Sequence, residues 1–209
     1  MSYKILTKKL YLTEEKIITR DLVRDYCKKL KLDYKIAIIY LLNNRYLYRI
    51  LRGIFYKPSI EERKLKKIDI DYKEAIAAAL KIKGIKNWYF GLETALKLNN
   101  YTHEYFTIDF IINDTIYRVK PLEIFGHKIK FSKLKKGLFK FGIKNHVSEI
   151  EKTVLDIIYL SKYGGFSDKE INNKIVDLIG YCSETKLLEY SENYNKNIVS
   201  FVEKLICKR

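Results

Sequence analysis

The sequence from Asp33 to Pro58 reads DYKIAIIYLLNNRYLYRILRGIFYKP, and this stretch decides the fold of the N-terminal third. Asp33 is a favourable N-cap, and the apolar residues after it predict a helix from Tyr34 to Asn43. The paired asparagines that follow tolerate the left-handed backbone at which helices end. Two short β-prone runs then flank Arg52-Gly53, a pattern typical of a β-hairpin.

A second helix precedes this stretch. Thr19 can cap a helix from Arg20 to about Leu30, in which apolar residues recur at core spacing and Cys27 is a small buried residue. Helix, turn, helix and hairpin in this order predict a winged helix-turn-helix domain over residues 1–62. Residues 59–70 are polar and poorly patterned, which indicates a boundary before a second domain at 68–209.

The second domain is predicted to be α+β. Helices are expected at 72–80 and 92–98, followed by four strands of one antiparallel sheet at 105–112, 115–120, 124–131 and 137–144. The C-terminal part is helical again at 149–163, 168–179 and about 184–207, with a candidate break at 191–193. The expected fold class is therefore α+β, with an N-terminal winged helix-turn-helix.

The net charge of +16 is concentrated in two segments. Residues 1–67 carry 18 basic and 7 acidic side chains, a net charge of +11, and residues 118–144 carry 9 and 1, a net charge of +8. The segments 68–117 and 145–209 have net charges of −2 and −1. A genome-wide bias toward lysine would spread the charge evenly, so the N-terminal concentration favours a nucleic-acid partner.

The helix 34–43 and the hairpin supply the candidate DNA contacts. Arginines at a hairpin tip can reach phosphates or the minor groove, tyrosine hydroxyls can bond phosphate oxygens, and outward residues of the helix can meet base edges. The alternative is a helix buried on most sides that contacts no base. The candidate residues are Arg20, Tyr34, Lys35, Ile39, Tyr40, Asn43, Arg45, Tyr48, Arg49, Arg52 and Lys57.

A second basic segment alternates lysines with apolar residues on predicted strands, which would make one face of the sheet positive. Such a face could bind RNA, the DNA backbone or an acidic protein, or it could simply be solvated. Its residues are Lys128, Lys130, Lys133, Lys135, Lys136 and Lys140.

The sequence offers little for catalysis. Asp69-Ile70-Asp71 lacks the Gly-Ser turn of nucleotide transferases, and Asp109 lacks the acid-x-Lys partner of a metal-dependent nuclease, which is the less favoured alternative. The histidines and cysteines have no zinc-ligand spacing, so neither a metal nor a cofactor is expected. Without a signal peptide or an apolar run of about 20 residues, the expectation is a non-enzymatic cytoplasmic protein with no membrane partner.

Three motifs, in order along the chain, resemble the AbiEi-like antitoxin family of type IV toxin–antitoxin systems. The first is the run from Thr19 to Tyr56, in which Arg45 stands where the family usually has glycine. The second is the segment 88–96, WYFGLETAL, with its glycine at Gly91. The third is the segment 147–156, VSEIEKTVLD, which resembles the E-[KR]-T-x-L-D helix of the family and contains Glu151, Lys152 and Asp156.

This resemblance implies a protein with two functions in abortive infection. The winged helix would bind inverted repeats in duplex DNA upstream of its own operon and act as an autorepressor. The C-terminal domain would counteract a nucleotidyltransferase-type toxin without requiring a stable complex. For Glu151, Lys152 and Asp156, helical spacing also suits ordinary capping and i,i+4 pairing, so a structural role is expected.

Overall fold

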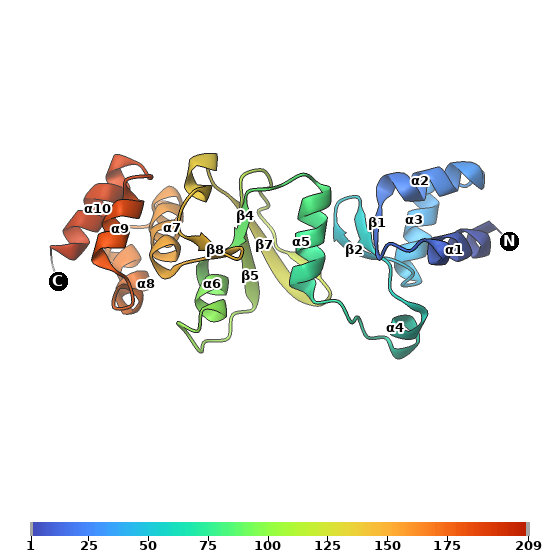
Figure 1. Ribbon diagram of the computed structural model, residues 1–209, viewed down its shortest axis with the longest axis horizontal. Helices are drawn as coiled ribbons and strands as arrows, with labels where there is room; N and C mark the ends of the chain where they lie inside the picture. The colour runs from blue at the N-terminus through green and yellow to red at the C-terminus, as the bar shows by residue number, and fades with distance from the viewer. Residues whose placement is uncertain (1, 208–209) are drawn as a thin grey trace. The chain divides into compact units, whose positions relative to one another are not determined.

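The computed structural model describes residues Ser2–Cys207, which form an α+β fold with two compact units (Figure 1). Unit 1 comprises the described residues up to Lys86 together with Glu123–Gly126. Unit 2 comprises Asn87–Leu122 and the described residues from His127 onward. No helix in this part of the chain is both long enough and apolar enough to cross a bilayer.

Unit 1 begins with α1 (Ser2–Leu12) and the short strand β1 (Ile17–Thr19). The helices α2 (Arg20–Lys29) and α3 (Tyr34–Asn43) follow, and then the hairpin of β2 (Tyr48–Leu51) and β3 (Ile54–Tyr56). The short α4 (Ile60–Leu65) and α5 (Tyr72–Ile82) complete it. The positions of α2, α3 and the hairpin agree with the prediction, whereas α1, β1 and α4 were not predicted.

The three strands of unit 1 form an antiparallel sheet with β3 in the centre. Every residue of β3 is buried, because β3 is paired on both edges and covered by the helices. The core beside the sheet is formed by Leu6, Leu10, Ile18, Val23, Cys27, Ala37, Ile38, Leu41, Leu47 and Phe55, so Cys27 is the small buried residue that was predicted.

The boundary between the units lies further along the chain than the predicted one at 59–70. Helix α5 belongs to unit 1, because its buried face, which includes Ala75 and Ile76, packs against β1 and β2. Phe125, between β6 and β7, also belongs to unit 1, and its ring meets Tyr48 and Tyr56 edge-on. The segment 59–70, which was predicted to hold the domain boundary, therefore lies inside unit 1.

A buried carboxylate, Glu62, fixes the chain between β3 and α5. One of its oxygens accepts hydrogen bonds from the Tyr56 hydroxyl (2.7 Å) and the Asp69 N–H (2.8 Å), and the other accepts from the Ser59 N–H (2.6 Å). Burial alone would raise the pKa of Glu62, but these donors outweigh it and hold the pKa below its usual value. The ionised form of Glu62 therefore stabilises unit 1.

Replacing Glu62 with glutamine is expected to destabilise unit 1 by about 1.5–2 kcal/mol at pH 7, because the neutral amide oxygen is a weaker acceptor and the amide NH2 group cannot accept a hydrogen bond at all. Since the folded pKa is below the unfolded one, the carboxylate stabilises the fold above about pH 4.5 and loses this effect as the pH falls through the folded pKa. The variant should therefore show a shallower loss of stability in acid. Urea unfolding followed by circular dichroism from pH 7 to pH 3 measures this, with the exposed Glu14→Gln as control. An identical acid profile in Glu62→Gln and wild type would contradict the expectation.

The second sheet is mixed and six-stranded, and all of it except Glu123 and Ile124 of β6 lies in unit 2, which also contains six helical segments. The strands are β4 (Trp88–Phe90), β5 (Ile108–Asn113), β6 (Leu122–Ile124), β7 (His127–Lys133), β8 (Ile143–Lys144) and β9 (Val147–Ser148), in the spatial order β6-β7-β5-β4-β9-β8. The helical segments are α6 (Leu92–Leu98), the 3-10 helix η1 (Lys136–Phe139), α7 (Ile150–Tyr163), α8 (Asp168–Ile179), α9 (Glu184–Ser191) and α10 (Lys196–Ile206). The predicted helices 92–98 and 168–179 and the break at 191–193 are confirmed.

The prediction of one antiparallel sheet of four strands was wrong. Strands β5 and β7 pair in parallel, as do β4 and β9. No strand forms at 115–120, because the Asn113 side chain accepts the Thr115 N–H (2.9 Å) and donates to the Ile116 carbonyl (2.9 Å), which ends β5 in a turn. The segment 137–144 is mostly η1 and turn, with Gly142 in the left-handed region (φ 62°).

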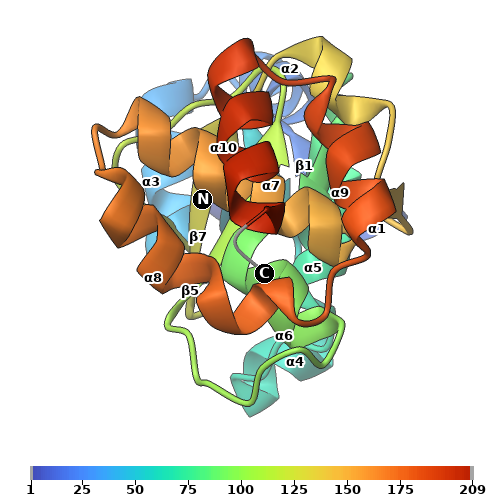
Figure 2. The ribbon, with the colours of Figure 1, turned by 90° about the vertical axis from the view of Figure 1, so that its left-hand side faces the viewer.

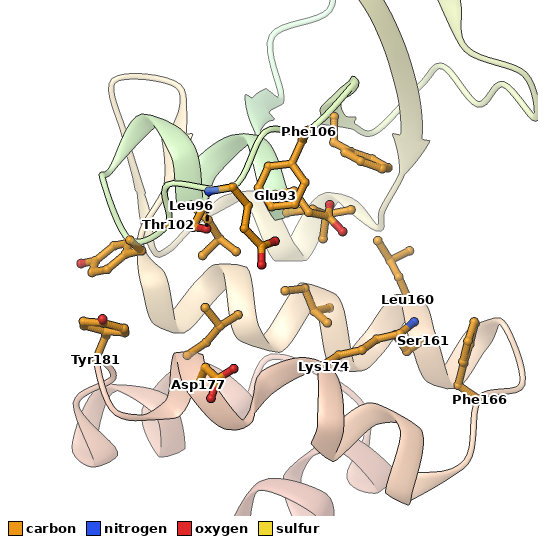
Figure 3. Close-up of a pocket in the computed structure, with 16 residues that line it drawn as sticks. Glu93, Leu96, Thr102, Phe106, Leu160, Ser161, Phe166, Lys174, Asp177 and Tyr181 are labelled. Atoms are coloured by element: carbon orange, nitrogen blue, oxygen red, sulfur yellow. Dashed lines mark hydrogen bonds between the residues drawn. The ribbon is translucent and has the colours of Figure 1, made fainter.

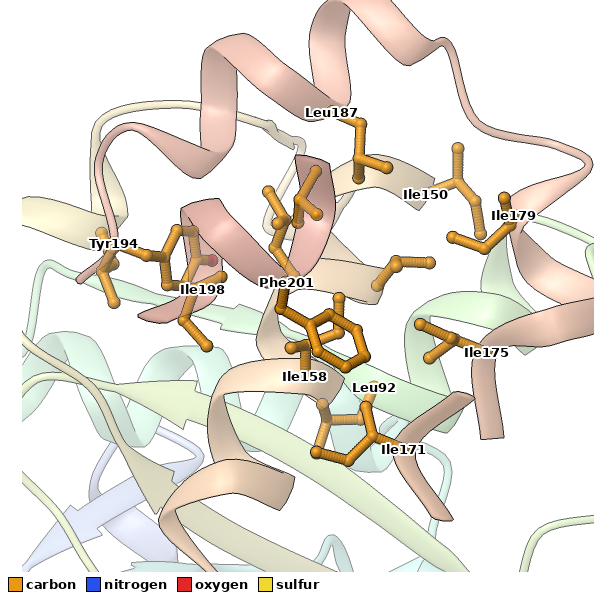
Figure 4. Close-up of a cluster of buried hydrophobic side chains, with 14 of the residues drawn as sticks. Leu92, Ile150, Ile158, Ile171, Ile175, Ile179, Leu187, Tyr194, Ile198 and Phe201 are labelled. Atoms are coloured by element: carbon orange, nitrogen blue, oxygen red, sulfur yellow. The ribbon is translucent and has the colours of Figure 1, made fainter. Parts of the chain in front are cut away.

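The core of unit 2 lies around α7, which is buried along most of its length (Figure 4). Helices α8, α9 and α10 lie around α7 (Figure 2). Apolar side chains from all four helices meet there, among them Ile158, Ile171, Leu187 and Phe201. Because α7 is enclosed in this way, polar residues on it must find partners inside the protein.

Candidate nucleic-acid interface

Both α2 and α3 begin at a side-chain cap, and the cap of α3 lies at the turn between the two helices. The Thr19 hydroxyl accepts a hydrogen bond from the Leu22 N–H (3.4 Å), and the Asp33 carboxylate accepts one from the Ile36 N–H (2.9 Å). Lys31 takes a left-handed backbone conformation (φ 53°), which lets the chain reverse quickly. These caps, together with the buried inner faces, hold α2 and α3 in a defined arrangement.

The outer face of α3 carries a lysine, two isoleucines and an asparagine. Lys35, Ile36, Ile39 and Asn43 are exposed, while the opposite face packs into the core of unit 1. The predicted outward direction of Lys35, Ile39 and Asn43 is thus confirmed. The helical spacing also predicts that Ile36 faces outward, and Ile36 shares this exposed face.

Two tyrosines of α3 are less available than predicted. Tyr40 is half-buried and stacks between Tyr3 and Tyr46, with ring centroids 4.8 and 5.9 Å away. Tyr34 is also half-buried, and the Arg24 guanidinium lies 5.1 Å from its ring centroid. Both rings therefore have partners within unit 1.

The hairpin presents one arginine on β2 and one at its turn. Arg49 and Arg52 are exposed, and Gly53 supplies the positive φ (80°) that the tight turn needs. The Gly53 carbonyl accepts the Arg20 N–H (2.8 Å), so the half-buried Arg20 lies at the base of this turn. The Tyr48 ring is half-buried and contacts Phe125 (6.1 Å between centroids).

Arg45 is exposed and occupies the end of α3 with a left-handed backbone (φ 55°). Its N–H donates to the Leu42 carbonyl (3.1 Å), and the Tyr46 N–H donates to the Leu41 carbonyl (2.8 Å), which closes the helix. Glycine adopts this conformation freely, whereas an arginine does so at a cost of about 1 kcal/mol. The left-handed backbone explains why glycine was the residue expected here.

Lys57 does not belong to the interface, contrary to the prediction. It is only 7% exposed, and its ammonium donates to the carbonyls of Leu10 (3.0 Å) and Thr13. The strand β3 is buried on both faces, so the side chain that follows it enters the protein instead of the solvent. Burial also lowers the pKa of Lys57.

The segment that forms α3 and the hairpin contains no acidic residue. From Tyr34 to Ile60 the chain contains neither aspartate nor glutamate, and four of its five basic residues are exposed. The exposed ones are Lys35, Arg45, Arg49 and Arg52. A polyanion approaching α3 or the hairpin tip therefore meets cations, amides and apolar groups from this segment, without a repelling carboxylate.

The second basic segment does not form the predicted positive sheet face. Lys128 and Lys130 alternate with buried residues on β7, and the Lys130 ammonium donates to the Val119 carbonyl. Lys133, the last residue of β7, is an odd number of positions from Lys128 and Lys130 and so does not share their face of the sheet. The remaining lysines lie in or beside η1, because the segment 137–144 is not a continuous strand. Those remaining lysines, Lys135, Lys136 and Lys140, are exposed.

In unit 2 the motif residues Lys152 and Asp156 form a fully buried ion pair (2.6 Å) on α7. The Lys152 ammonium also donates to the hydroxyls of Tyr89 (2.9 Å) and Tyr194 (2.8 Å), and both hydroxyls donate to the Asp156 carboxylate (2.6 Å each). Burial lowers the pKa of Lys152, and the negative charge of Asp156 opposes this effect. Burial also raises the pKa of Tyr89 and that of Tyr194 well above the usual value for tyrosine. The expected i,i+4 pair is present, and its burial makes it inaccessible to a partner.

The other two motif residues also have structural contacts. Glu151 is buried, and its carboxylate accepts the Ser183 N–H (3.0 Å) at the start of α9. Gly91 precedes α6, and a Cβ atom there would come within 2.7 Å of the Ile112 side chain. A glycine is therefore needed at this position for close packing and not for its backbone angles.

Two of the carboxylates considered for catalysis have structural contacts. Asp71 caps α5 by accepting the Lys73 N–H (2.7 Å), and the Thr94 hydroxyl lies 3.4 Å from the Asp109 carboxylate. Within Ser2–Cys207, no group of three or more histidine, cysteine, aspartate or glutamate residues is arranged to hold a metal ion. The aspartate at position 71 of the Asp69-Ile70-Asp71 motif therefore has a structural role as the N-cap of α5.

Unit 2 also contains a cleft of about 590 Å³ between the α6 region and the helices α7 and α8 (Figure 3). The carboxylates of Glu93, Glu104 and Asp177 line it, and one Glu93 oxygen is buried without a hydrogen-bond partner. Its one lining cation, Lys174, lies over the Phe166 ring at 3.6 Å. An acidic lining of this kind repels phosphates, so the cleft does not extend the candidate interface.

No family model and no curated protein matches this chain. Among solved structures, the chain is similar to the crystal structure of the RV2827C protein from Mycobacterium tuberculosis, with a TM-score of 0.56 and 10% sequence identity. The similarity covers 99% of this chain and 76% of that chain. At this level of identity the likeness shows the fold alone.

Proposed function

We propose that the protein is a transcriptional regulator that binds duplex DNA through unit 1 as a winged helix-turn-helix. In this proposal α3 is the recognition helix and the β2–β3 hairpin is the wing. The observation that carries it is the exposed outer surface of these two elements, which contain no acidic residue and present Arg49 on β2 and Arg52 at the hairpin turn. Arginines on a hairpin can contact phosphates or the minor groove. A helix whose exposed face carries both polar and apolar side chains can contact base edges in the major groove.

Replacing Arg49 and Arg52 together with alanine tests the wing. If each contacts a phosphate, the slope of log K against log salt should become shallower by about 1.8, and affinity near physiological salt should fall at least about tenfold. The measurement is a salt titration of binding to duplex DNA from the region upstream of the protein's own gene.

The matched control removes two exposed lysines of the same unit, Lys81 in the last turn of α5 and its C-cap residue Lys83, as Lys81→Ala/Lys83→Ala. This variant loses the same formal charge and should keep most of the wild-type slope. If both double variants behaved alike, the arginines would contribute only general charge. If the wild type did not bind duplex DNA at all, the proposed function would be wrong.

The motif resemblance supports a second part of the proposal. The regulator represses its own operon through inverted repeats, and unit 2 counteracts a nucleotidyltransferase-type toxin without a stable complex. The two activities separate in the full chain, because the wing variant Arg49→Ala/Arg52→Ala leaves unit 2 intact. We expect this variant to lose repression and still rescue cells that express a toxin encoded beside the gene. Rescue that disappears together with DNA binding would contradict a separate antitoxin activity in unit 2.

A binding function requires no turnover by the chain itself. Incubation with Mg²⁺ or Mn²⁺, labelled nucleotides and nucleic acid is expected to give neither cleavage nor transfer. Turnover that is lost in Asp109→Asn would instead favour a metal-dependent nuclease.

A further inference from the structure

Two isoleucines stand exposed in the middle of the outer face of α3. Ile36 is 58% exposed and Ile39 is 55% exposed, although both lie on a helix whose other face is core. Lys35 and Asn43 share this exposed face. Single exposed apolar residues are common on proteins, but two such neighbours on a presented helix form a small apolar surface available to a partner.

Charge decides which partner fits this surface. The segment around the isoleucines is basic and acid-free from Tyr34 to Ile60. Pairing this face with a second copy of itself would bring Lys35 and the neighbouring arginines against like charges, whereas a polyanion complements them. In the major groove of DNA, the apolar group that a side chain meets is the 5-methyl group of thymine.

We propose that Ile36 and Ile39 contact thymine methyl groups in the major groove, so that unit 1 prefers A·T-rich half-sites. Asn43, on the same face, has an amide that matches the donor and acceptor pair of adenine. The inference rests on the proposed function, since it takes α3 as the recognition helix. It adds a determinant of sequence preference that is separate from the phosphate contacts of the arginines.

Deoxyuridine provides a direct probe, because it differs from thymidine only by the missing methyl group. The full chain is first used to select its preferred duplex from a random-sequence duplex library. The selected duplex is then made again with deoxyuridine in place of every thymidine. Each lost methyl contact should weaken binding about fourfold, so two contacts predict a loss of about tenfold or more.

The isoleucine variants link this loss to α3. In Ile36→Ala/Ile39→Ala the thymidine duplex should bind more weakly, and the ratio between the thymidine and deoxyuridine duplexes should fall to about one. The salt slope should stay at the wild-type value, because no phosphate contact is removed. Ile60→Ala on α4 is the matched control, since Ile60 is 50% exposed and lies off this face. It should keep the full ratio.

The outcomes separate the inference from the proposed function. Absence of DNA binding by the wild type would overturn both. Sequence-selective binding with equal affinity for the two duplexes, or an unchanged ratio in the double isoleucine variant, would overturn the inference alone. Sedimentation of each variant measures its oligomeric state. If the isoleucine substitutions changed the oligomeric state but not the ratio of affinities for the thymidine and deoxyuridine duplexes, the outer face of α3 would be a contact between copies of the chain. That result would also overturn the inference.

Discussion

Replacing Asp156 with asparagine is expected to destabilise unit 2 by about 3–5 kcal/mol, because it leaves the buried Lys152 ammonium without its counter-charge. Lys152 and Asp156 are both fully buried, and the three donors of the ammonium are matched by Asp156, Tyr89 and Tyr194. The substitution preserves shape, removes the charge and replaces one accepting carboxylate oxygen with an NH2 donor. Chemical unfolding followed by fluorescence measures the effect, since the only tryptophan, Trp88, lies in β4 of unit 2.

The double variant Lys152→Met/Asp156→Asn distinguishes charge compensation from packing. It removes both charges together and leaves an amide oxygen as acceptor for the tyrosine hydroxyls. We therefore expect it to be less destabilised than the sum of the two single variants, with a coupling of about 2 kcal/mol or more. Additive single effects would mean that the ion pair contributes no more than its separate contacts.

The single variant Asp156→Asn should also depend on pH in a defined direction. Burial lowers the pKa of Lys152, and the loss of Asp156 removes the interaction that raises it. With a folded pKa below the unfolded one, the unfolded chain binds more protons in the interval between them. The stability of Asp156→Asn should consequently rise as the pH approaches about 10.4, the unfolded value for lysine. A variant that is no more stable at pH 9.5 than at pH 7 would contradict this account.

Local signals explain what could be predicted from the sequence. The bounds of α3 follow from the Asp33 cap and the asparagines after it, and the hairpin turn follows from Gly53. The pairing of Lys152 with Asp156 follows from their i,i+4 spacing. Each of these features depends on residues that are close together in the chain.

The features that could not be predicted depend on distant partners. The parallel pairing of β5 with β7 requires the intervening chain to cross back before β7 begins, and no local sequence pattern specifies this crossover. The burial of the ion pair depends on Tyr89, which lies 67 positions before Asp156. For α5, the amphipathic pattern predicted a helix but could not show that its apolar face packs against β1 and β2.

Lys57 shows the same limit within the candidate site. Its charge and its position beside the hairpin made it resemble Arg49 and Arg52. Its burial, however, is decided by the carbonyls of Leu10 and Thr13 at the end of α1, more than 40 positions away. A helix end leaves such carbonyls without intrahelical partners, and a cation there satisfies them.

Replacing Lys57 with methionine is therefore expected to destabilise unit 1 by about 2–3 kcal/mol, because two buried carbonyls lose a charged donor while the packing of the aliphatic stem is kept. Amide hydrogen exchange in α1 and β3 measures this locally, and the exposed Lys67→Met serves as the matched control. At a temperature where the variant remains folded, its salt slope for DNA binding should equal that of wild type, unlike that of Arg49→Ala/Arg52→Ala. If α1 of the variant kept wild-type protection from amide exchange while the salt slope of DNA binding became shallower, Lys57 would contact DNA and this account would be wrong. The experiment thus separates a lysine that holds unit 1 together from the arginines proposed to contact DNA, although all three carry the same charge beside the same hairpin.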